Sequence, residues 1–193
     1  MKNLSKYRGC LIGGAVGDAL GYAVEFDTVA EIQRNYGECG ITQYEKVNGE
    51  ALISDDTQMT LFTANGILLG ITRGRMRGIM GPMEDYVHRA YLDWLYTQTG
   101  KSPSKHQCTW LRNVDRLKAR RAPGNTCLSA LESDICGTLE KPINNSKGCG
   151  GVMRVAPIGL YFCEHENESE ITMLGAKAAA ITHGHPLGFI PAA

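Results

Sequence analysis

Two adjacent carboxylates, Asp55 and Asp56, follow Ser54 at the start of an apolar run that is typical of a helix. Neighbouring like charges repel each other, by roughly 1–4 kcal/mol at a separation of 4 Å. These side chains could cap the helix, because hydroxyl and carboxylate oxygens accept its first N–H bonds and acids favour its positive end. The same oxygens are hard ligands that suit Mg²⁺, Mn²⁺ or Ca²⁺. The segment therefore predicts a helix cap, a divalent-cation site, or both.

Another pair of acids, Asp18 and Glu25, lies in a stretch rich in small residues. Seven residues are about two helical turns, so the two acids would share one face, roughly 10 Å apart along the axis. An acid among small apolar residues needs a partner, and a metal ion or a backbone N–H would serve. Helical glycines cost about 1 kcal/mol each relative to alanine. We therefore expect residues 7–24 to pack closely against another backbone or a ligand.

A glycine-rich loop, with Gly148, Gly150 and Gly151, precedes a second apolar helical run. Successive amides in such a turn can bind an anion, and the helix end adds positive potential. The glycines could equally serve the backbone geometry of a flexible turn. The loop is not a P-loop, because no Gly-Lys-Ser/Thr sequence follows it.

Two histidines, His183 and His185, stand in a turn closed by Pro186. A His-x-His pair suits zinc, but the sequence shows no obvious third nitrogen or sulfur ligand. A substrate contact is the favoured role for His183, and a hydrogen-bonded structural histidine is the alternative.

Helices must position these residues, because the apolar residues recur mainly with a helical period. We predict helices over residues 7–24, 56–70, 82–97, 109–120, 126–138 and 168–182, with Pro82 beginning the third and Gly70 capping the second. Only residues 40–53 could extend or form a hairpin. The sequence thus predicts a mainly α-helical single domain over residues 1–193, without internal repeats.

The composition limits the class of protein. Of the 193 residues, 43% are hydrophobic and 21% charged, as in globular proteins. Basic and acidic residues number 20 each, and no basic stripe is present, so nucleic acid is not expected as a partner. No segment matches a membrane span or an export signal. The scattered cysteines lack CxxC spacing and are expected to be reduced thiols. These observations favour a cytoplasmic protein and leave its oligomeric state open.

Four segments together resemble the ADP-ribosylglycohydrolase family, which includes the dinitrogenase reductase-activating glycohydrolases. They are GCLIGGAVGDALGYAVEF, SDDTQMT, GCGGVMRVAPIGL and THGHPLG, in the family's order. The resemblance runs from about residue 8 to the last residue. It implies an all-α, orthogonal multi-helix fold with two divalent cations, Mg²⁺ or Mn²⁺, in a central cleft.

The resemblance also implies roles for individual residues. Ser54, Asp55 and Asp56 would be metal ligands, and Glu25 would contact a metal ion or the attacking water and transfer its proton. Asp18 would have a supporting role. The diphosphate of ADP-ribose would lie against the loop, and His183 would contact the phosphate or ribose side. The loop residues that the resemblance assigns to the ligand are Gly148, Cys149, Gly150, Gly151 and Met153.

Members of the family carry a second Asp-x-Asp-Thr/Ser segment far downstream, and the 193 residues contain none. The resemblance therefore implies the N-terminal part of the domain, with an incomplete set of metal ligands.

The implied activity is hydrolysis of the ADP-ribosyl N- or O-glycosidic bond at C1″ in modified proteins or small molecules, with Glu25, Asp55 and Asp56 as the catalytic residues. Such cleavage passes through an oxocarbenium-like transition state. Two alternatives stay open. One is a catalytically incomplete relative that binds ADP-ribose, and the other is a metal-dependent hydrolase of nucleotide phosphates that would release AMP. The sequence does not choose between Mg²⁺ and Mn²⁺, nor does it identify the acceptor of ADP-ribose.

Overall fold

The computed structural model of the chain describes residues 4–164 and 166–193. Within these ranges the regular structure is helical, apart from one isolated bridge between Val47 and Glu50, so the predicted all-α class is confirmed. The α-helices are α1 (Leu4–Gly21), α2 (Val29–Tyr36), α3 (Asp55–Arg77), α4 (Met83–Thr99), α5 (Asn125–Glu132), α6 (Ala156–Phe162), α7 (Glu168–Ala180) and α8 (Pro186–Phe189). The 3-10 helices are η1 (Tyr22–Val24), η2 (Trp110–Asn113), η3 (Asp115–Lys118), η4 (Cys149–Arg154) and η5 (Ile190–Ala192).

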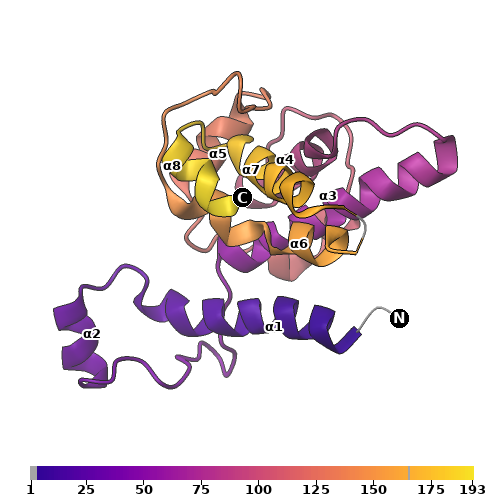
Figure 1. The fold of residues 1–193 in the computed structure, drawn as a ribbon. Coiled ribbons are helices and arrows are strands. Elements are labelled where there is room, and N and C mark those ends of the chain that lie inside the picture. The colour runs from indigo at the N-terminus through magenta and orange to yellow at the C-terminus, as the bar shows by residue number, and fades with distance from the viewer. Residues whose placement is uncertain (1–3, 165) are drawn as a thin grey trace.

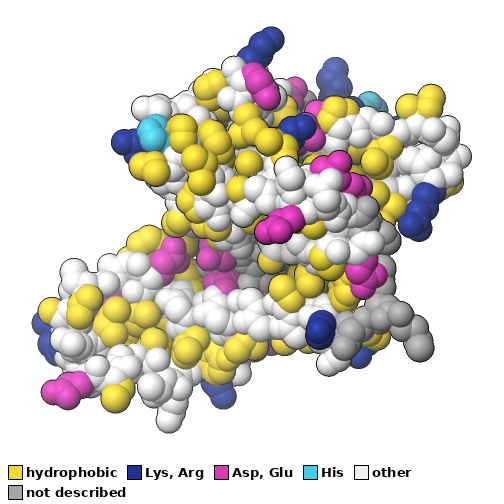
Figure 2. All heavy atoms as spheres, in the orientation of Figure 1, with side chains coloured by type: hydrophobic (Ala, Val, Ile, Leu, Met, Phe, Trp, Pro, Cys, Tyr) yellow, Lys and Arg dark blue, Asp and Glu magenta, His cyan; other side chains and the backbone are white. Residues whose placement is uncertain are grey.

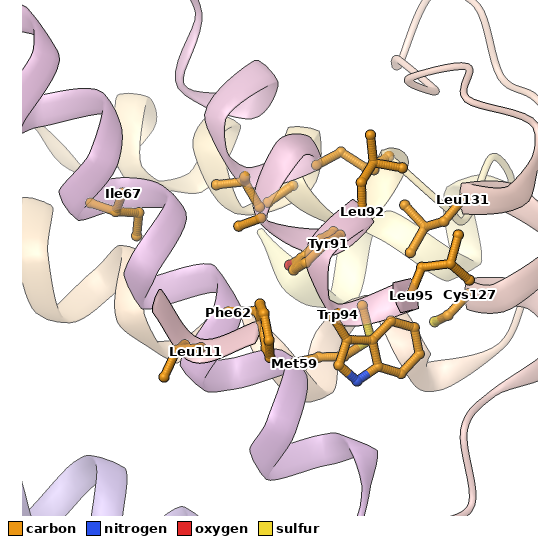
Figure 3. Packing of buried hydrophobic residues seen from close by; sticks show 14 of the residues in the cluster. Met59, Phe62, Ile67, Tyr91, Leu92, Trp94, Leu95, Leu111, Cys127 and Leu131 are labelled. Atoms are coloured by element: carbon orange, nitrogen blue, oxygen red, sulfur yellow. The ribbon is translucent and has the colours of Figure 1, made fainter. Parts of the chain in front are cut away.

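Helices α3 to α8 pack together as one body, and α1 runs along one side of it with α2 beyond the end of α1 (Figure 1). Helix α1 contacts the body through α3 and α6. The core lies mainly between α3 and α4, where the largest buried side chains meet (Figure 3). They include Met59, Phe62 and Ile67 of α3 and Tyr91, Trp94 and Leu95 of α4. This pairing holds the first turn of α3 in a fixed position.

Two glycines allow α3 to approach α4 closely. A Cβ atom at Gly66 would lie 2.8 Å from Val87 Cα, and one at Gly70 would lie 2.8 Å from the Tyr86 ring. The predicted cap at Gly70 is therefore wrong, because that glycine lies inside the helix at a contact. The helix ends instead at Gly78, whose φ of 72° is the left-handed conformation typical of a glycine cap.

Among the described residues, the glycines of the first helix do not pack closely against another backbone, and the alternative of a ligand stays a prediction. Nothing lies within 4 Å of a Cβ atom built at Gly13, Gly14 or Gly17, and Ala19 is the one buried residue of α1. Asp18 and Glu25 also do not share a single α-helix. Helix α1 ends at Gly21, and Glu25 follows the short η1 turn.

Other boundaries differ from the sequence prediction as well. Residues 109–120 form two short 3-10 helices in place of one helix, and the helix predicted over 126–138 ends at Glu132. Helix α2 was not predicted, although Thr28 and Glu31 form a capping box in which each side chain accepts the other's backbone N–H. All seven cysteines are free thiols. None of the described helices has the length and apolar character needed to cross a bilayer.

Candidate active site

The predicted helix cap is present at the start of α3. Ser54 is extended, with φ of −97° and ψ of −165°, and its Oγ accepts a hydrogen bond from the backbone N of Asp56 at 3.2 Å. Asp55 and Asp56 occupy the first turn, where the positive end of the helix dipole favours negative charge. The cap therefore fixes both carboxylates at the same helix end.

Asp18 reaches the same helix end from α1. Its carboxylate accepts hydrogen bonds from Ser54 N at 2.9 Å and from Thr57 N at 3.2 Å, and the Thr57 hydroxyl also donates to it. Of the two partners expected for this acid, the structure shows backbone N–H groups. Asp18 thus joins α1 to the first turn of α3. The sequence predicted that this acid needs a partner, but not which residues supply it.

Asp55 is the more deeply buried of the two neighbouring acids, with 3% of its surface exposed. Burial raises the pKa of Asp55 to about 7, and repulsion from Asp56 and Glu25 adds to the rise. The N–H of Gly124, which donates to Asp55 Oδ2 at 3.0 Å, opposes this shift. A positive charge placed near Asp55 would stabilise its ionised form and lower this pKa.

Asp56 faces a small cavity between α1, α3 and η4. The cavity has a volume of about 150 Å³, and its lining includes Asp18, Asp56, Thr60 and Met153. Burial and then repulsion from Asp18 raise the pKa of Asp56. Burial, followed by repulsion from Asp56 and Asp18, also raises the pKa of Glu25. Figure 2 shows acidic side chains gathered in the hollow between α1 and the body.

The glycine-rich loop lies next to the first turns of α3. The Thr60 hydroxyl of α3 donates to the carbonyl of Asp56 at 2.7 Å and also lies 3.3 Å from the carbonyl oxygen of Met153, and Thr60 and Met153 both line the cavity that Asp56 faces. Gly148 precedes the 3-10 helix η4, and the loop residues Gly148 and Cys149 are exposed. The structure therefore brings together two segments that are about a hundred positions apart in the sequence.

The glycines of this loop lie in close contact with neighbouring residues, and the contact with backbone is tightest at Gly151. A Cβ atom at Gly148 would lie 3.3 Å from His183 Nε2, and one at Gly150 would lie 3.0 Å from His183 Cε1. At Gly151 a Cβ atom would lie 2.7 Å from the carbonyl oxygen of Gly188. None of these three glycines has a positive φ, so the explanation from turn geometry alone does not hold.

The two histidines of the C-terminal turn have different surroundings. His183 is 2% exposed and lies under the loop, with its Nδ1 2.8 Å from the Thr182 hydroxyl. Burial, with a further contribution from Arg154, lowers the pKa of His183 to about 4. His185 is a structural residue, because its Nδ1 accepts the N–H of Leu187 at 3.0 Å and so caps α8.

Sequence reasoning gave no role to Arg154, one turn after the loop. Its guanidinium is fully buried, lies 4.3 Å from the centre of the Tyr91 ring and donates to the Thr182 hydroxyl at 2.7 Å. An arginine in an apolar run is a signal that could have marked this residue, because such a charge needs partners inside the core.

The model of the ADP-ribosylglycohydrolase family matches residues 1–193, the whole chain. The chain belongs to this family. The curated relatives of the chain include the ADP-ribosyl-[dinitrogen reductase] glycohydrolase of Rhodospirillum rubrum, which is 30% identical over 93% of this chain and 51% of its own length. An uncharacterised protein of Archaeoglobus fulgidus is 28% identical over 92% of this chain and 49% of its own length.

The chain thus spans about half the length of these two curated relatives. No solved structure matches it. The family is one of hydrolases, and the all-α class of the chain is the one expected for it.

The metal-binding roles expected for the acidic residues stay a prediction, and the structure shows which oxygen donors lie near one another. Ser54, Asp55, Asp56 and Glu25 provide hard oxygen donors, and three carboxylates repel one another near the start of α3. Among the described residues, however, no three His, Cys, Asp or Glu side chains converge closely enough to hold an ion. Oxygen donors of this kind are those that Mg²⁺ and Mn²⁺ prefer.

Proposed function

We propose that this chain contributes the acidic half and the ADP-ribose-binding loop of a metal-dependent hydrolase that removes ADP-ribose from modified proteins or small molecules. The proposal rests on one observation, that the acidic start of α3 and the glycine-rich loop line the same cavity. The first turn of α3, with Asp56, and the loop side of η4, with Met153, line the same 150 Å³ space. Family membership supports the reaction class.

Within this site the acidic residues would hold the divalent cations. Ser54, Asp55 and Asp56 would supply ligands from the first turn of α3, and Glu25 would supply one from the segment after α1. Bound cations would orient the ribose hydroxyls and lower the pKa of a bound water. The raised pKa values of Asp55, Asp56 and Glu25 support this assignment. A bound cation would stabilise the charged carboxylates and so offset both their loss of hydration and their mutual repulsion.

Glu25 would transfer the proton in the reaction. It is the exposed member of the acidic group, and its pKa is raised by partial desolvation of its carboxylate and by repulsion from Asp56 and Asp18. A carboxyl group whose pKa lies closer to neutrality is a better general acid or base. The loop residues Gly148, Cys149, Gly150, Gly151 and Met153, with His183 beneath them, would bind the diphosphate.

A direct test uses the protein expressed from the full reading frame that contains this chain, with Mn²⁺ and proteins ADP-ribosylated on arginine or on serine, and measures the ADP-ribose released. The proposal predicts release that is lost when Asp55→Asn and Asp56→Asn are combined. Asp115→Asn is the matched control, because Asp115 is an exposed acid paired with Lys118 on η3. If the double variant releases as much ADP-ribose as the control, the assignment of these acids is wrong.

One observation favours a second candidate function, a non-hydrolytic ADP-ribose binder. The described residues contain no group of three ligands able to hold a metal. In this case ADP-ribose would bind with equal affinity with and without Mn²⁺, and no release would occur from either modified protein. Release of AMP in place of ADP-ribose would instead indicate a hydrolase of nucleotide phosphates.

A further inference from the structure

The buried Arg154 lies at the centre of a chain of hydrogen bonds that ends under the glycine-rich loop. Its Nη2 donates to the Thr182 Oγ1 at 2.7 Å and to the carbonyl of Ala178 at 3.2 Å. Thr182 Oγ1 in turn lies 2.8 Å from His183 Nδ1. All three side chains are buried, with exposures of 0%, 0% and 2%. The guanidinium is therefore linked to the imidazole through a single hydroxyl group.

We propose that Arg154, acting through Thr182, fixes His183 as the neutral tautomer with its proton on Nε2, so that Nε2–H is a hydrogen-bond donor toward the glycine-rich loop. Arg154 and Thr182 are then positioning residues for His183. That this donor serves a phosphate oxygen of ADP-ribose rests on the proposed function, whereas the tautomer itself follows from the buried contacts.

The direction of the hydrogen bonds follows from what each group is able to donate. A guanidinium only donates, so Thr182 Oγ1 is the acceptor of the bond from Arg154. The hydroxyl proton then turns to its best remaining acceptor. A bare imidazole nitrogen is a strong acceptor, whereas the other neighbour of Thr182, the Cys127 thiol, is a weak one. The hydroxyl therefore donates to Nδ1, which carries no proton.

Electrostatics favours the same tautomer. The positive charge of Arg154 lies on the Nδ1 side of the ring, beyond Thr182, and it is fully buried. A lone pair directed toward this charge is stabilised, and an N–H directed toward it is destabilised. The competing arrangement, with Nδ1–H donating to Thr182 and the hydroxyl proton directed to Cys127, loses on both counts.

His183 Nε2 is free to hydrogen-bond to a ligand at the loop. No described residue hydrogen-bonds to it, and it is not among the buried atoms that lack a partner, so it reaches the surface. The missing side chains at Gly148 and Gly150 leave this opening, since a Cβ at either position would lie 3.3 Å from Nε2. An N–H at this position would be directed toward an anion bound in the loop, where a charge-assisted bond is strong.

Nitrogen NMR of the chain labelled with ¹⁵N-histidine tests the tautomer directly. Long-range ¹⁵N–¹H correlations distinguish a protonated ring nitrogen from a bare one, and His183→Gln identifies the signals of His183 by their loss. The wild-type chain is expected to show protonated Nε2 and bare Nδ1 at pH 7. Protonated Nδ1 in the wild-type chain would overturn the proposal whether or not any variant folds.

A matched pair of variants tests the relay. Thr182→Ser keeps the hydroxyl and should keep the Nε2–H tautomer, whereas Thr182→Val keeps the volume, removes the hydroxyl and should give a mixture of tautomers. An unchanged tautomer in Thr182→Val would show that the relay does not set it.

Titration with ADP-ribose separates this proposal from the function. If His183 carries its proton on Nε2, the Nε2 signal should move on binding, and Thr182→Val should bind about tenfold more weakly than Thr182→Ser. No binding by the wild-type chain would count against the proposed function, and the tautomer result would still decide the relay. Binding that leaves the Nε2 signal unmoved would overturn the assignment of a donor to the loop.

Discussion

At the scale of single residues, the site depends on groups whose protonation is set by burial. Asp55, near the start of α3, has its pKa raised to about 7, and His183, under the loop, has its pKa lowered to about 4. Both shifts favour the neutral form, as burial requires when no counter-charge is close. The two ends of the candidate site therefore differ in chemistry. Asp55 is an acid whose ionised form a cation would stabilise, and His183 is a neutral imidazole.

The buried imidazole predicts a pH dependence of stability. In the unfolded chain His183 takes up a proton below about 6.5, whereas in the folded chain its pKa is lowered to about 4. Between these values the unfolded state binds more protons, so stability falls as the pH falls from 6.5 to 4. We expect wild type to lose unfolding free energy relative to His183→Gln over this range, measured by urea unfolding at several pH values. Parallel curves for the two proteins would contradict the lowered pKa.

The loop glycines predict an effect on ligand binding. In Gly150→Ala the new Cβ would lie 3.0 Å from His183 Cε1 and 3.1 Å from Cys127 Sγ, so the ring must move. We expect ADP-ribose to bind about tenfold more weakly, the loss of one charge-assisted hydrogen bond. Gly159→Ala is the control, because nothing lies within 4 Å of its Cβ. Equal affinities of the two variants would show that the position of the ring does not matter to binding.

At the scale of helices, the sequence predicted the elements with a regular apolar face and missed those defined by contacts. Helix α4 was predicted almost in full, and α3 was predicted from its first turn, because Ser54 and the acids give a clear start signal. Its end was misplaced because Gly70 has the character of a cap in the sequence and is a contact glycine in the fold. A local pattern does not reveal which glycine faces another helix.

The candidate site was predicted as a set of residues but not as an arrangement. The four segments were recognised in the sequence, including the capping role of Ser54. Three of the site's contacts join residues that are far apart in the chain. They are the hydrogen bond from Ser54 N to Asp18, the contact of Thr60 with Met153 and the hydrogen bond from Arg154 to Thr182. Such contacts depend on packing between helices, which residue spacing alone does not determine.

The close contact of α3 with α4 predicts a stability effect. Gly66→Ala would place a Cβ 2.8 Å from Val87 Cα and 3.0 Å from the Tyr86 carbonyl oxygen, so the helices must separate. Overpacking of this kind costs about 1–3 kcal/mol of unfolding free energy. Gly159→Ala, at an open helical position, should instead stabilise the chain by about 0.4–1 kcal/mol. Chemical denaturation of the two variants measures both effects, and a Gly66→Ala protein as stable as wild type would refute the contact.

At the scale of the whole molecule, α1 and the residues that follow it are largely exposed, and among residues 4–50 only Ala19 is buried. Helix α1 has one buried residue, and large apolar side chains such as Phe26 and Val29 are exposed beyond it. The hydrogen bonds of Asp18 to Ser54 and Thr57 join this part to α3. Together with the packing of α1 against α3 and α6, these hydrogen bonds place Glu25 near Asp56.

The junction predicts a change in protease sensitivity. Asp18→Ala removes the acceptor of the Ser54 and Thr57 N–H groups, so α1 should separate from α3 more often. We expect faster cleavage within residues 22–53 by limited proteolysis, with little change in the rate for the body. Asp27→Ala, an exposed acid in the same region, is the control. Equal cleavage rates in the two variants would show that Asp18 does not hold α1 in place.

The central claim is that the acids of α3 and the glycine-rich loop form one site for a divalent cation and ADP-ribose. Calorimetric titration of the chain with ADP-ribose, with and without Mn²⁺, tests it most directly. We predict that Mn²⁺ strengthens the binding of ADP-ribose and that the combined Asp55→Asn and Asp56→Asn variant loses this effect while still binding ADP-ribose alone. A wild-type affinity that Mn²⁺ leaves unchanged, or no binding of ADP-ribose in either condition, would contradict the account.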